Sequence, residues 1–240
     1  MISERTFAER YTSFWHQALP MGEEVISTVN NHLTREFPRR HWILPDRETR
    51  QDLISEISLR WFSARIVEGR LSKLTPSPVE LEQLATEAWR FIGHLRGSPN
   101  PELPSPSRAE IQEAKSLTEI LVEFSRFRND PGLIVPRPSF AGCGLLSACH
   151  GDVLIGQTLY EIKSVDRGSH QPDLRQIVVY CALNFASPQY DIRRVGLLNP
   201  RRGTYFDSDL EWLIQNLSGK GSAELFYEIL DFLSTERVSV

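Results

Sequence analysis

The sequence predicts a mixed α/β (α+β) protein, with an α-helical N-terminal region followed by a core organised around one β-hairpin. Apolar residues recur at helical spacing through most of the first hundred residues. Further along, the apolar runs His150–Ile155 and Thr158–Val165 flank the dipeptide Gly156-Gln157. A two-residue loop that begins with glycine favours a tight type II′ hairpin, so these two runs are expected to pair as antiparallel strands.

The N-terminal region is expected to hold four helices. Their apolar positions repeat with a helical period over Thr6–Ala18, Gly22–Phe37, Thr49–Glu68 and Ser77–Arg96. The segment Gly97–Pro106 contains four prolines in ten residues, which cannot continue a helix. We therefore divide the chain into a helical region, residues 1–100, and a core with C-terminal helices, residues 101–240.

The core begins with a capping box, in which Ser107 caps a helix and Glu110 reaches back to it. This helix is expected to run to about Arg128. A strand over Leu133–Phe140 follows, and its two prolines suit an edge position or the strand ends. After the hairpin, the pattern predicts a helix from residue 172 or 173 to about 186, strands over 192–198 and 204–206, and helices over 208–217 and 222–233.

The predicted hairpin register gathers three charged residues on one face. Asp152 lies opposite Glu161, and Lys163 follows two residues later on the same face. Directly opposed carboxylates have Cβ atoms about 5 Å apart and repel each other unless a cation lies between them. Magnesium binds one or two carboxylates and keeps several waters, so the trio suits metal-assisted phosphodiester hydrolysis. The alternative is an edge hairpin whose polar face, with Glu161 and Lys163, is simply solvated.

Asp152 and the run Glu161-Ile162-Lys163 together resemble the core motif of the PD-(D/E)XK nuclease superfamily, with Gly151 where the family name has proline. Downstream, Gln176 and Tyr180 form a Q-x(3)-Y arrangement similar to that of the RecB-like/Cas4-like branch. One helical turn separates these two residues, so they share a face. The resemblance covers roughly residues 107–200.

The resemblance implies a restriction-endonuclease-like core, in which helices flank a mixed central sheet, and a nuclease that uses Mg²⁺ or Mn²⁺ to cut DNA. The metal ligands would be Asp152, Glu161, the Ile162 carbonyl and Glu113, and the other catalytic residues would be Lys163, Gln176 and Tyr180. Lys163 would position the attacking water and stabilise the developing charge. Glu113 falls within the apolar stripe of its helix, and the alternative is that it only borders that stripe in solvent.

Several family relatives carry four cysteines that hold an iron–sulfur cluster. This chain has three, Cys143, Cys149 and Cys181, and none follows the core, so no cluster is expected. The net charge of −4 means that DNA binding would need a local basic groove rather than a basic surface. The best local cations are Arg175, Arg193, Arg194, Arg201 and Arg202.

Several other classes of protein are excluded by pattern. No apolar run reaches the roughly 18 residues of a membrane span, and the first residues lack the apolar core of a signal peptide, so we expect a cytoplasmic protein without membrane contact. The sequence lacks the phosphate-binding glycine loops of ATPases. If translocation or unwinding is part of the biology, a separate ATPase or helicase subunit would supply it. A homodimer would suit double-strand cutting.

The sequence therefore predicts a divalent-metal-dependent DNA nuclease, with a role in DNA repair or in defence against foreign DNA. The alternative is a catalytically silent subunit of the same fold that binds DNA or another protein within a larger complex. A third reading, a helical protein with a coincidental hairpin, predicts no divalent-ion binding at all.

Overall fold

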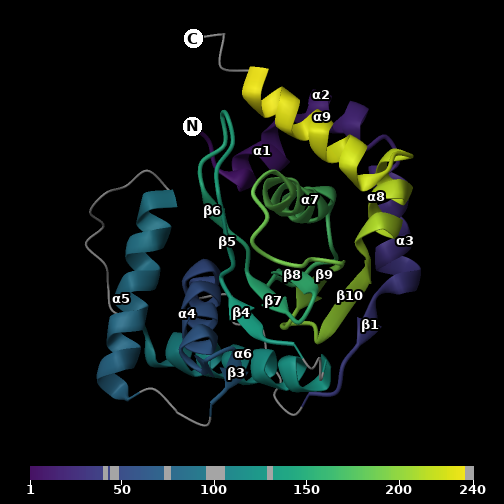
Figure 1. Cartoon of the computed structure of the whole chain (residues 1–240). Helices are drawn as coiled ribbons and strands as arrows, with labels where there is room; N and C mark the ends of the chain where they lie inside the picture. Colours follow the sequence, from purple (N-terminus) through teal and green to yellow (C-terminus); the bar gives the residue numbers. More distant parts are fainter. Residues whose placement is uncertain (40–42, 44–48, 73–76, 96–105, 129–131, 236–240) are drawn as a thin grey trace.

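The computed structural model describes residues 1–39, 43, 49–72, 77–95, 106–128 and 132–235. Its described part is a mixed α/β fold in which helices flank a six-stranded sheet, with strand order β1-β10-β9-β8-β7-β4 (Figure 1). Strands β8 and β9 run parallel, whereas the remaining neighbours in this sheet are antiparallel. The predicted α/β class and the mixed sheet between helices are therefore confirmed.

The helices are α1 (Glu4–Arg10), α2 (Thr12–Ala18), α3 (Gly22–Thr28), the π-helix η1 (Val29–Leu33), α4 (Gln51–Ala64), α5 (Pro78–Leu95), α6 (Arg108–Arg128), α7 (Gln171–Ala186), α8 (Leu210–Ser218) and α9 (Ser222–Thr235). The strands are β1 (Arg35–Glu36), β2 (Ile66–Val67), β3 (Arg70–Leu71), β4 (Ile134–Pro136), β5 (Ser139–Phe140), β6 (Cys149–His150), β7 (Val153–Ile155), β8 (Thr158–Ile162), β9 (Arg194–Asn199) and β10 (Thr204–Asp209).

The two faces of the central sheet are covered by different helices. Helix α7 lies on one face, and α1, α3, α8 and α9 pack around it in a large apolar cluster that includes Trp15, Ile177 and Leu197 (Figure 1). Helix α6 lies on the other face, where Phe124 packs edge-on against the buried ring of Tyr160 in β8, with ring centroids 5.1 Å apart. The hairpin strands are thus buried between two helical layers.

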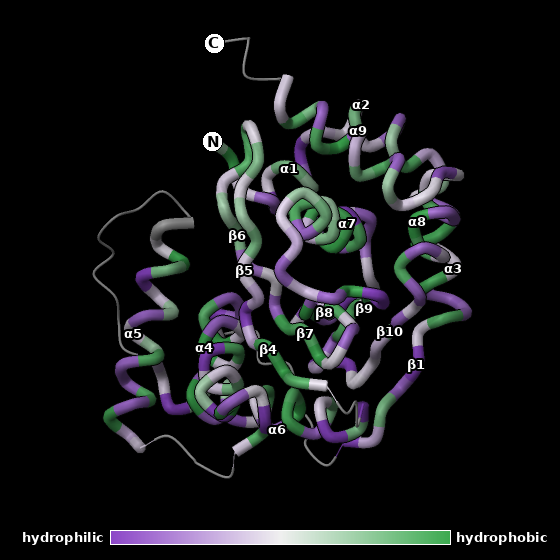
Figure 2. Tube along the Cα trace, viewed as in Figure 1, coloured by the Kyte–Doolittle hydropathy of each residue, from purple (hydrophilic) through white to green (hydrophobic). Residues whose placement is uncertain are grey.

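Helices α4, α5 and α6 form a separate apolar cluster beyond the second face of the sheet. Hydrophobic and hydrophilic residues alternate along α5, as expected for a helix at the margin of the molecule (Figure 2). The capping box before α6 is confirmed, because Glu110 N–H donates to Ser107 Oγ at 3.2 Å and Ser107 N–H donates to Glu110 Oε2 at 2.8 Å. Among the described residues, no helix has the length and apolarity to cross a membrane.

Some N-terminal boundaries differ from those that the sequence predicts. The expected helix over Thr6–Ala18 is two helices, because the backbone of Tyr11 leaves the helical region between α1 and α2. The expected helix over Gly22–Phe37 ends at Leu33, and Thr34 turns the chain so that β1 pairs with β10 at the sheet edge. That pairing is a long-range contact, and a helical period in the local sequence does not reveal it.

The expected helix over Thr49–Glu68 stops at Ala64 and is followed by the small β2–β3 hairpin. Glu68 and Gly69 form its turn with φ of 50° and 73°. The expected strand over Leu133–Phe140 divides into β4 and β5, and β4 does lie at a sheet edge.

The predicted boundary segment lies outside the described residues over 96–105. The first 36 residues pack against the C-terminal helices through α1 and α3 and add a strand to the central sheet. The division of the chain at residue 100 stays a prediction.

Candidate active site

The β7–β8 hairpin has the register that the sequence predicts. Val153 pairs with Tyr160, Leu154 with Leu159 and Ile155 with Thr158. The turn glycine, Gly156, has φ of 58°, whereas Gln157 is not in the left-handed region, as a type II′ turn requires. Asp152, just before β7, is therefore brought to the level of Glu161.

Asp152 is fixed to the neighbouring strand rather than free in solvent. Its Oδ2 atom accepts a hydrogen bond from the backbone N–H of Ile162 at 2.6 Å. Glu161 is buried, with 4% of its surface exposed. Glu161 is thus buried and Asp152 half-buried, and charges in such positions are costly unless a cation compensates them.

Lys163 supplies one compensating cation. Its Nζ donates to Glu161 Oε1 at 2.8 Å and to Gln176 Oε1 at 2.6 Å. Asp173 Oδ1 lies 3.7 Å from the same nitrogen. The lysine side chain is 23% exposed, so it is held mostly within the protein and keeps some contact with solvent.

Helix α7 positions the other two predicted residues. A capping box between His170 and Asp173 begins the helix, and Gln176 and Tyr180 lie one turn apart on its buried side. The Tyr180 ring stacks on Phe140 of β5, with ring centroids 5.3 Å apart and planes 17° apart. Gln176 thus contacts Lys163, and Tyr180, one turn later on the buried side of the helix, packs against β5.

The electrostatics of the site reflect burial and crowded charge. Burial and then the charge of Glu161 raise the pKa of Asp152 well above its usual value. Burial lowers the pKa of Lys163, but the carboxylates of Glu161, Asp173 and Asp152 outweigh it, and the net pKa is raised. Burial and then the charges of Glu161 and Asp152 raise the pKa of Tyr180 well above its usual value. At neutral pH the lysine is therefore charged and the tyrosine hydroxyl keeps its proton.

One carboxylate oxygen of the site has no donor among the described residues. Glu161 Oε2 is buried and has no hydrogen-bond partner within the described part of the chain. A buried carboxylate oxygen without a donor is costly, and a bound cation would satisfy it. Carboxylates at Asp152 and Glu161, with the adjacent Ile162 carbonyl, make a hard oxygen donor set that fits Mg²⁺ or Mn²⁺. No group of three or more His, Cys, Asp or Glu side chains with metal-binding geometry occurs among the described residues, so water would complete such a site.

Glu4 is a further acidic residue near the site that the sequence did not indicate. It begins α1, which packs against α7, and the charges of Glu161 and Lys163 act on it. Burial is the largest cause that raises the pKa of Glu4. No local pattern marks this residue, because its proximity depends on the packing of α1 against a helix more than 160 residues away in the chain.

Glu113 is not among the residues that the structure brings together at the hairpin. Its Oε1 atom lies 2.5 Å from Arg201 Nη1, and Oε2 accepts a hydrogen bond from Thr49 Oγ1 at 3.2 Å. Arg201 in turn donates from Nε to the carbonyl of Ser164 at 3.1 Å, next to Lys163. Glu113 therefore forms an ion pair with Arg201, which in turn binds the backbone just after β8. The role of Glu113 as a metal ligand stays a prediction.

The five arginines that the sequence singled out occupy different environments. Arg175 and Arg201 are buried, and Arg194 forms an ion pair with Asp207 at 2.5 Å. Arg193 and Arg202 are exposed and lie just before and shortly after β9. Cys149 and Cys181 are buried free thiols, and burial raises the pKa of each to about 12, whereas Cys143 is partly exposed.

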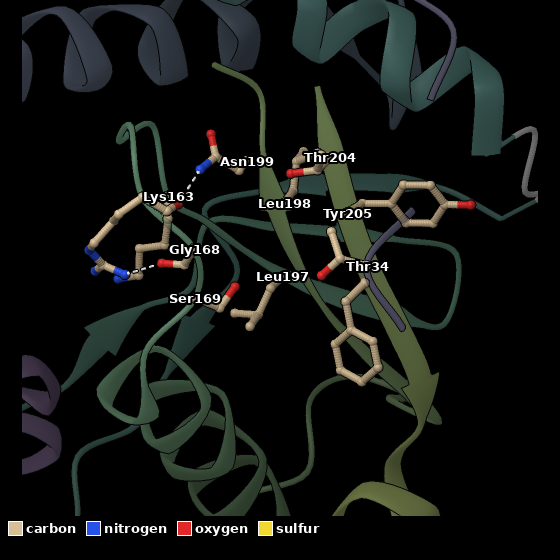
Figure 3. A pocket seen from close by; sticks show the side chains of 11 residues that line it. Thr34, Lys163, Gly168, Ser169, Leu197, Leu198, Asn199, Thr204 and Tyr205 are labelled. Atoms are coloured by element: carbon tan, nitrogen blue, oxygen red, sulfur yellow. Dashed lines mark hydrogen bonds between the residues drawn. The ribbon is translucent and has the colours of Figure 1, made fainter. Parts of the chain in front are cut away.

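A small pocket lies beside Lys163 at the carboxyl ends of β8 and β9 (Figure 3).

No model of a known protein family matches the chain, and the comparison with curated proteins gave no match.

Proposed function

We propose that this chain is a divalent-metal-dependent DNA nuclease of the PD-(D/E)XK superfamily, in its RecB-like branch, that hydrolyses phosphodiester bonds. The observation that carries the proposal is the arrangement around Lys163, whose Nζ lies 2.8 Å from Glu161 Oε1 and 2.6 Å from Gln176 Oε1. The five residues that the resemblance implies come from the hairpin, the residue that follows it and one face of helix α7. A solvated edge hairpin would not bury Glu161 or leave its Oε2 atom without a donor.

In the proposed mechanism, Asp152 and Glu161 would hold the metal ion, and the Ile162 carbonyl would be a further ligand. A bound Mg²⁺ or Mn²⁺ would polarise the scissile phosphate and acidify a bound water. The bond from Ile162 N–H to Asp152 Oδ2 fixes that carboxylate, leaving its other oxygen for the ion.

Lys163 acts as a cation, because the surrounding carboxylates keep its pKa raised. Its ammonium group orients the attacking water and stabilises the negative charge that develops on the phosphoryl oxygens. Gln176 restrains the ammonium group through its carbonyl oxygen. The charges of the same carboxylates act on Tyr180 and help to raise its pKa, so its hydroxyl keeps its proton and remains a hydrogen-bond donor.

Cleavage of linear duplex, circular duplex and single-stranded DNA with Mg²⁺ or Mn²⁺, each compared with EDTA, tests the proposal. We expect metal-dependent cutting that Asp152→Ala abolishes. The matched control is Asp191→Ala, because Asp191 is an exposed aspartate at the far end of β9. Cutting of the circular substrate would identify an endonuclease.

The proposal would be overturned if the wild type cut DNA and the Asp152→Ala variant cut it at the same rate. DNA binding without cleavage on any substrate would instead favour the catalytically silent subunit. Absence of both DNA binding and divalent-ion binding would favour a coincidental hairpin.

A further inference from the structure

A bend in the chain lies directly beside Asp152. Strand β4 pairs with β7 up to Pro136 and Val153, and the same two segments pair again as β5 and β6 from Ser139 and His150 onward. The β5–β6 ribbon belongs to a separate two-stranded sheet and extends away from the central one (Figure 1). Asp152 therefore lies where the ribbon leaves the central sheet.

Arg137 lies opposite Asp152 in this bend and has a backbone conformation that few residues other than glycine adopt. Its φ is 50°, in the left-handed region. It also precedes Pro138, and a residue before proline is biased toward extended backbone. In the described part of the chain, the only other non-glycine residue with such a φ is Glu68, which lies in the β2–β3 turn, where this backbone is ordinary.

Backbone and side-chain contacts hold Arg137 in this conformation. Its N–H donates to the Asp152 carbonyl at 2.9 Å, and its own carbonyl oxygen lies 3.3 Å from His150 Nδ1. Its Nη1 atom donates to Glu56 Oε1 of α4 at 2.8 Å, and its guanidinium lies over the Phe91 ring of α5, 5.2 Å from the ring centroid. Strained backbone persists only where surrounding contacts enforce it, so these contacts anchor the bend to the helices beyond the sheet.

The bend changes how the end of β8 is bonded. Lys163 N–H donates to the Leu198 carbonyl of β9 at 2.8 Å. Successive N–H groups point to opposite edges of a strand, so the N–H of Ile162 points toward β7. The pairing of β7 with β8 ends at Val153, and the Asp152 carboxylate accepts the bond from Ile162 N–H at 2.6 Å. The carboxylate thus takes the place that a backbone carbonyl would occupy if the ribbon continued straight.

The charge of Arg137 also acts on Asp152. Burial is the largest cause that raises the pKa of this carboxyl, and the arginine acts in the opposite direction. We propose that Arg137 is a positioning residue for Asp152. Its left-handed backbone makes the bend, and its contacts with Glu56 and Phe91 maintain it. The bend holds the Asp152 carboxylate against Ile162 N–H. The catalytic importance of that placement rests on the proposed nuclease function, but the placement can be measured without metal or DNA.

The test is amide hydrogen exchange of the full chain, measured by NMR in EDTA. The readout is the exchange rate of the Ile162 amide divided by that of the Lys163 amide, because the first is bonded to Asp152 and the second to β9. Global destabilisation speeds both alike, whereas movement of the Asp152 carboxylate speeds only the first. The variants are Arg137→Ala, Arg137→Gly and Arg137→Lys. The matched control is Glu68→Gly, which relieves the same backbone conformation at the β2–β3 turn.

We expect Arg137→Ala to raise this ratio at least about 10-fold, because alanine has no anchor and disfavours left-handed backbone. Glycine adopts that backbone freely, so Arg137→Gly should raise it about 3-fold. Arg137→Lys keeps a cation for Glu56 and should stay within about 2-fold, as should Glu68→Gly. An unchanged ratio in Arg137→Ala, or one no higher than in Arg137→Gly, would overturn the proposal. Should Arg137→Ala not fold, an Arg137→Gly ratio equal to that of the wild type would overturn it.

DNA cleavage and Mg²⁺ binding separate this proposal from the nuclease itself. If the wild type cuts DNA and Arg137→Ala leaves the exchange ratio unchanged, the positioning role fails while the nuclease stands. If no DNA is cut but Arg137→Ala raises the ratio, the positioning role stands and the nuclease fails. If both stand, Arg137→Ala should bind Mg²⁺ about 10-fold more weakly than the wild type, as expected when the support of a metal ligand is lost.

Discussion

Asp152→Asn should stabilise the metal-free protein and abolish the proposed metal-dependent cleavage. The hairpin register brings Asp152 to the level of Glu161, and residues opposed in this way have Cβ atoms about 5 Å apart, which sets the scale of the repulsion between their carboxylates. At an effective dielectric constant of about 20, their repulsion amounts to about 3 kcal/mol. The ammonium group of Lys163, 2.8 Å from Glu161, offsets part of it. Asparagine has nearly the same shape and keeps an acceptor for Ile162 N–H, so we expect a net gain of about 1–2 kcal/mol in the free energy of unfolding.

The assay is urea unfolding of wild type and variant, first in EDTA and then with Mg²⁺. A ligand at about ten times its dissociation constant adds about 1.4 kcal/mol to the stability of a protein that binds it only when folded. Magnesium should therefore stabilise the wild type and leave Asp152→Asn nearly unchanged. The control, Asp191→Asn, should match the wild type with and without metal. A variant less stable than the wild type in EDTA, or one that Mg²⁺ stabilises equally, would refute this account of the carboxylate pair.

Three further predictions follow from described contacts. Hydrogen bonds from Arg50 and from the backbone lower the pKa of Glu110 to about 2, so its contribution to stability is present above about pH 4.5 and is lost as the pH falls toward 2. Allowing for the partial exposure of Arg50, Glu110→Gln should lower the free energy of unfolding, measured with urea, by about 2 kcal/mol at pH 7. An equal difference between variant and wild type at pH 2.5 would contradict this. A Cβ atom on Gly196 would lie 2.5 Å from the Phe206 carbonyl oxygen and 2.6 Å from the Tyr160 ring. Gly196→Ala should therefore destabilise the fold by about 2 kcal/mol. A melting temperature equal to that of the wild type would contradict this prediction. Tyr180→Phe should keep the ring stack on Phe140 and the unfolding free energy within about 1 kcal/mol while lowering the cleavage rate, and an unchanged rate would remove Tyr180 from the site.

Local patterns in the sequence predict the parts of this fold that depend on near neighbours. The Gly156-Gln157 turn fixes the register of β7 and β8, since a slip by one residue would turn every side chain to the other face. The spacing of Ser107 and Glu110 likewise predicts the start of α6. The candidate site is accessible to sequence reasoning for the same reason, because its residues come from one hairpin and one helix.

The features that the sequence does not reveal depend on distant segments. β1 becomes a strand because the edge of β10 is open to it, although the residues before it have a helical period. Glu4 reaches the site only through the packing of α1 on α7. Glu113 lies in the apolar stripe of α6, as expected of an inward-facing carboxylate. Its ion-pair partner, Arg201, lies 88 residues later in the chain, just after β9.

The most direct test of the central claim is the rate of Mg²⁺-dependent DNA cleavage by Lys163→Ala. The matched control is Lys220→Ala, because Lys220 is another partly exposed lysine that pairs with a glutamate, Glu228, but lies between α8 and α9. We predict that Lys163→Ala lowers the single-turnover rate by at least about 100-fold, as expected for loss of a group that stabilises developing charge, while Lys220→Ala cuts at the wild-type rate. Cleavage by the folded Lys163→Ala protein at the wild-type rate would contradict the account.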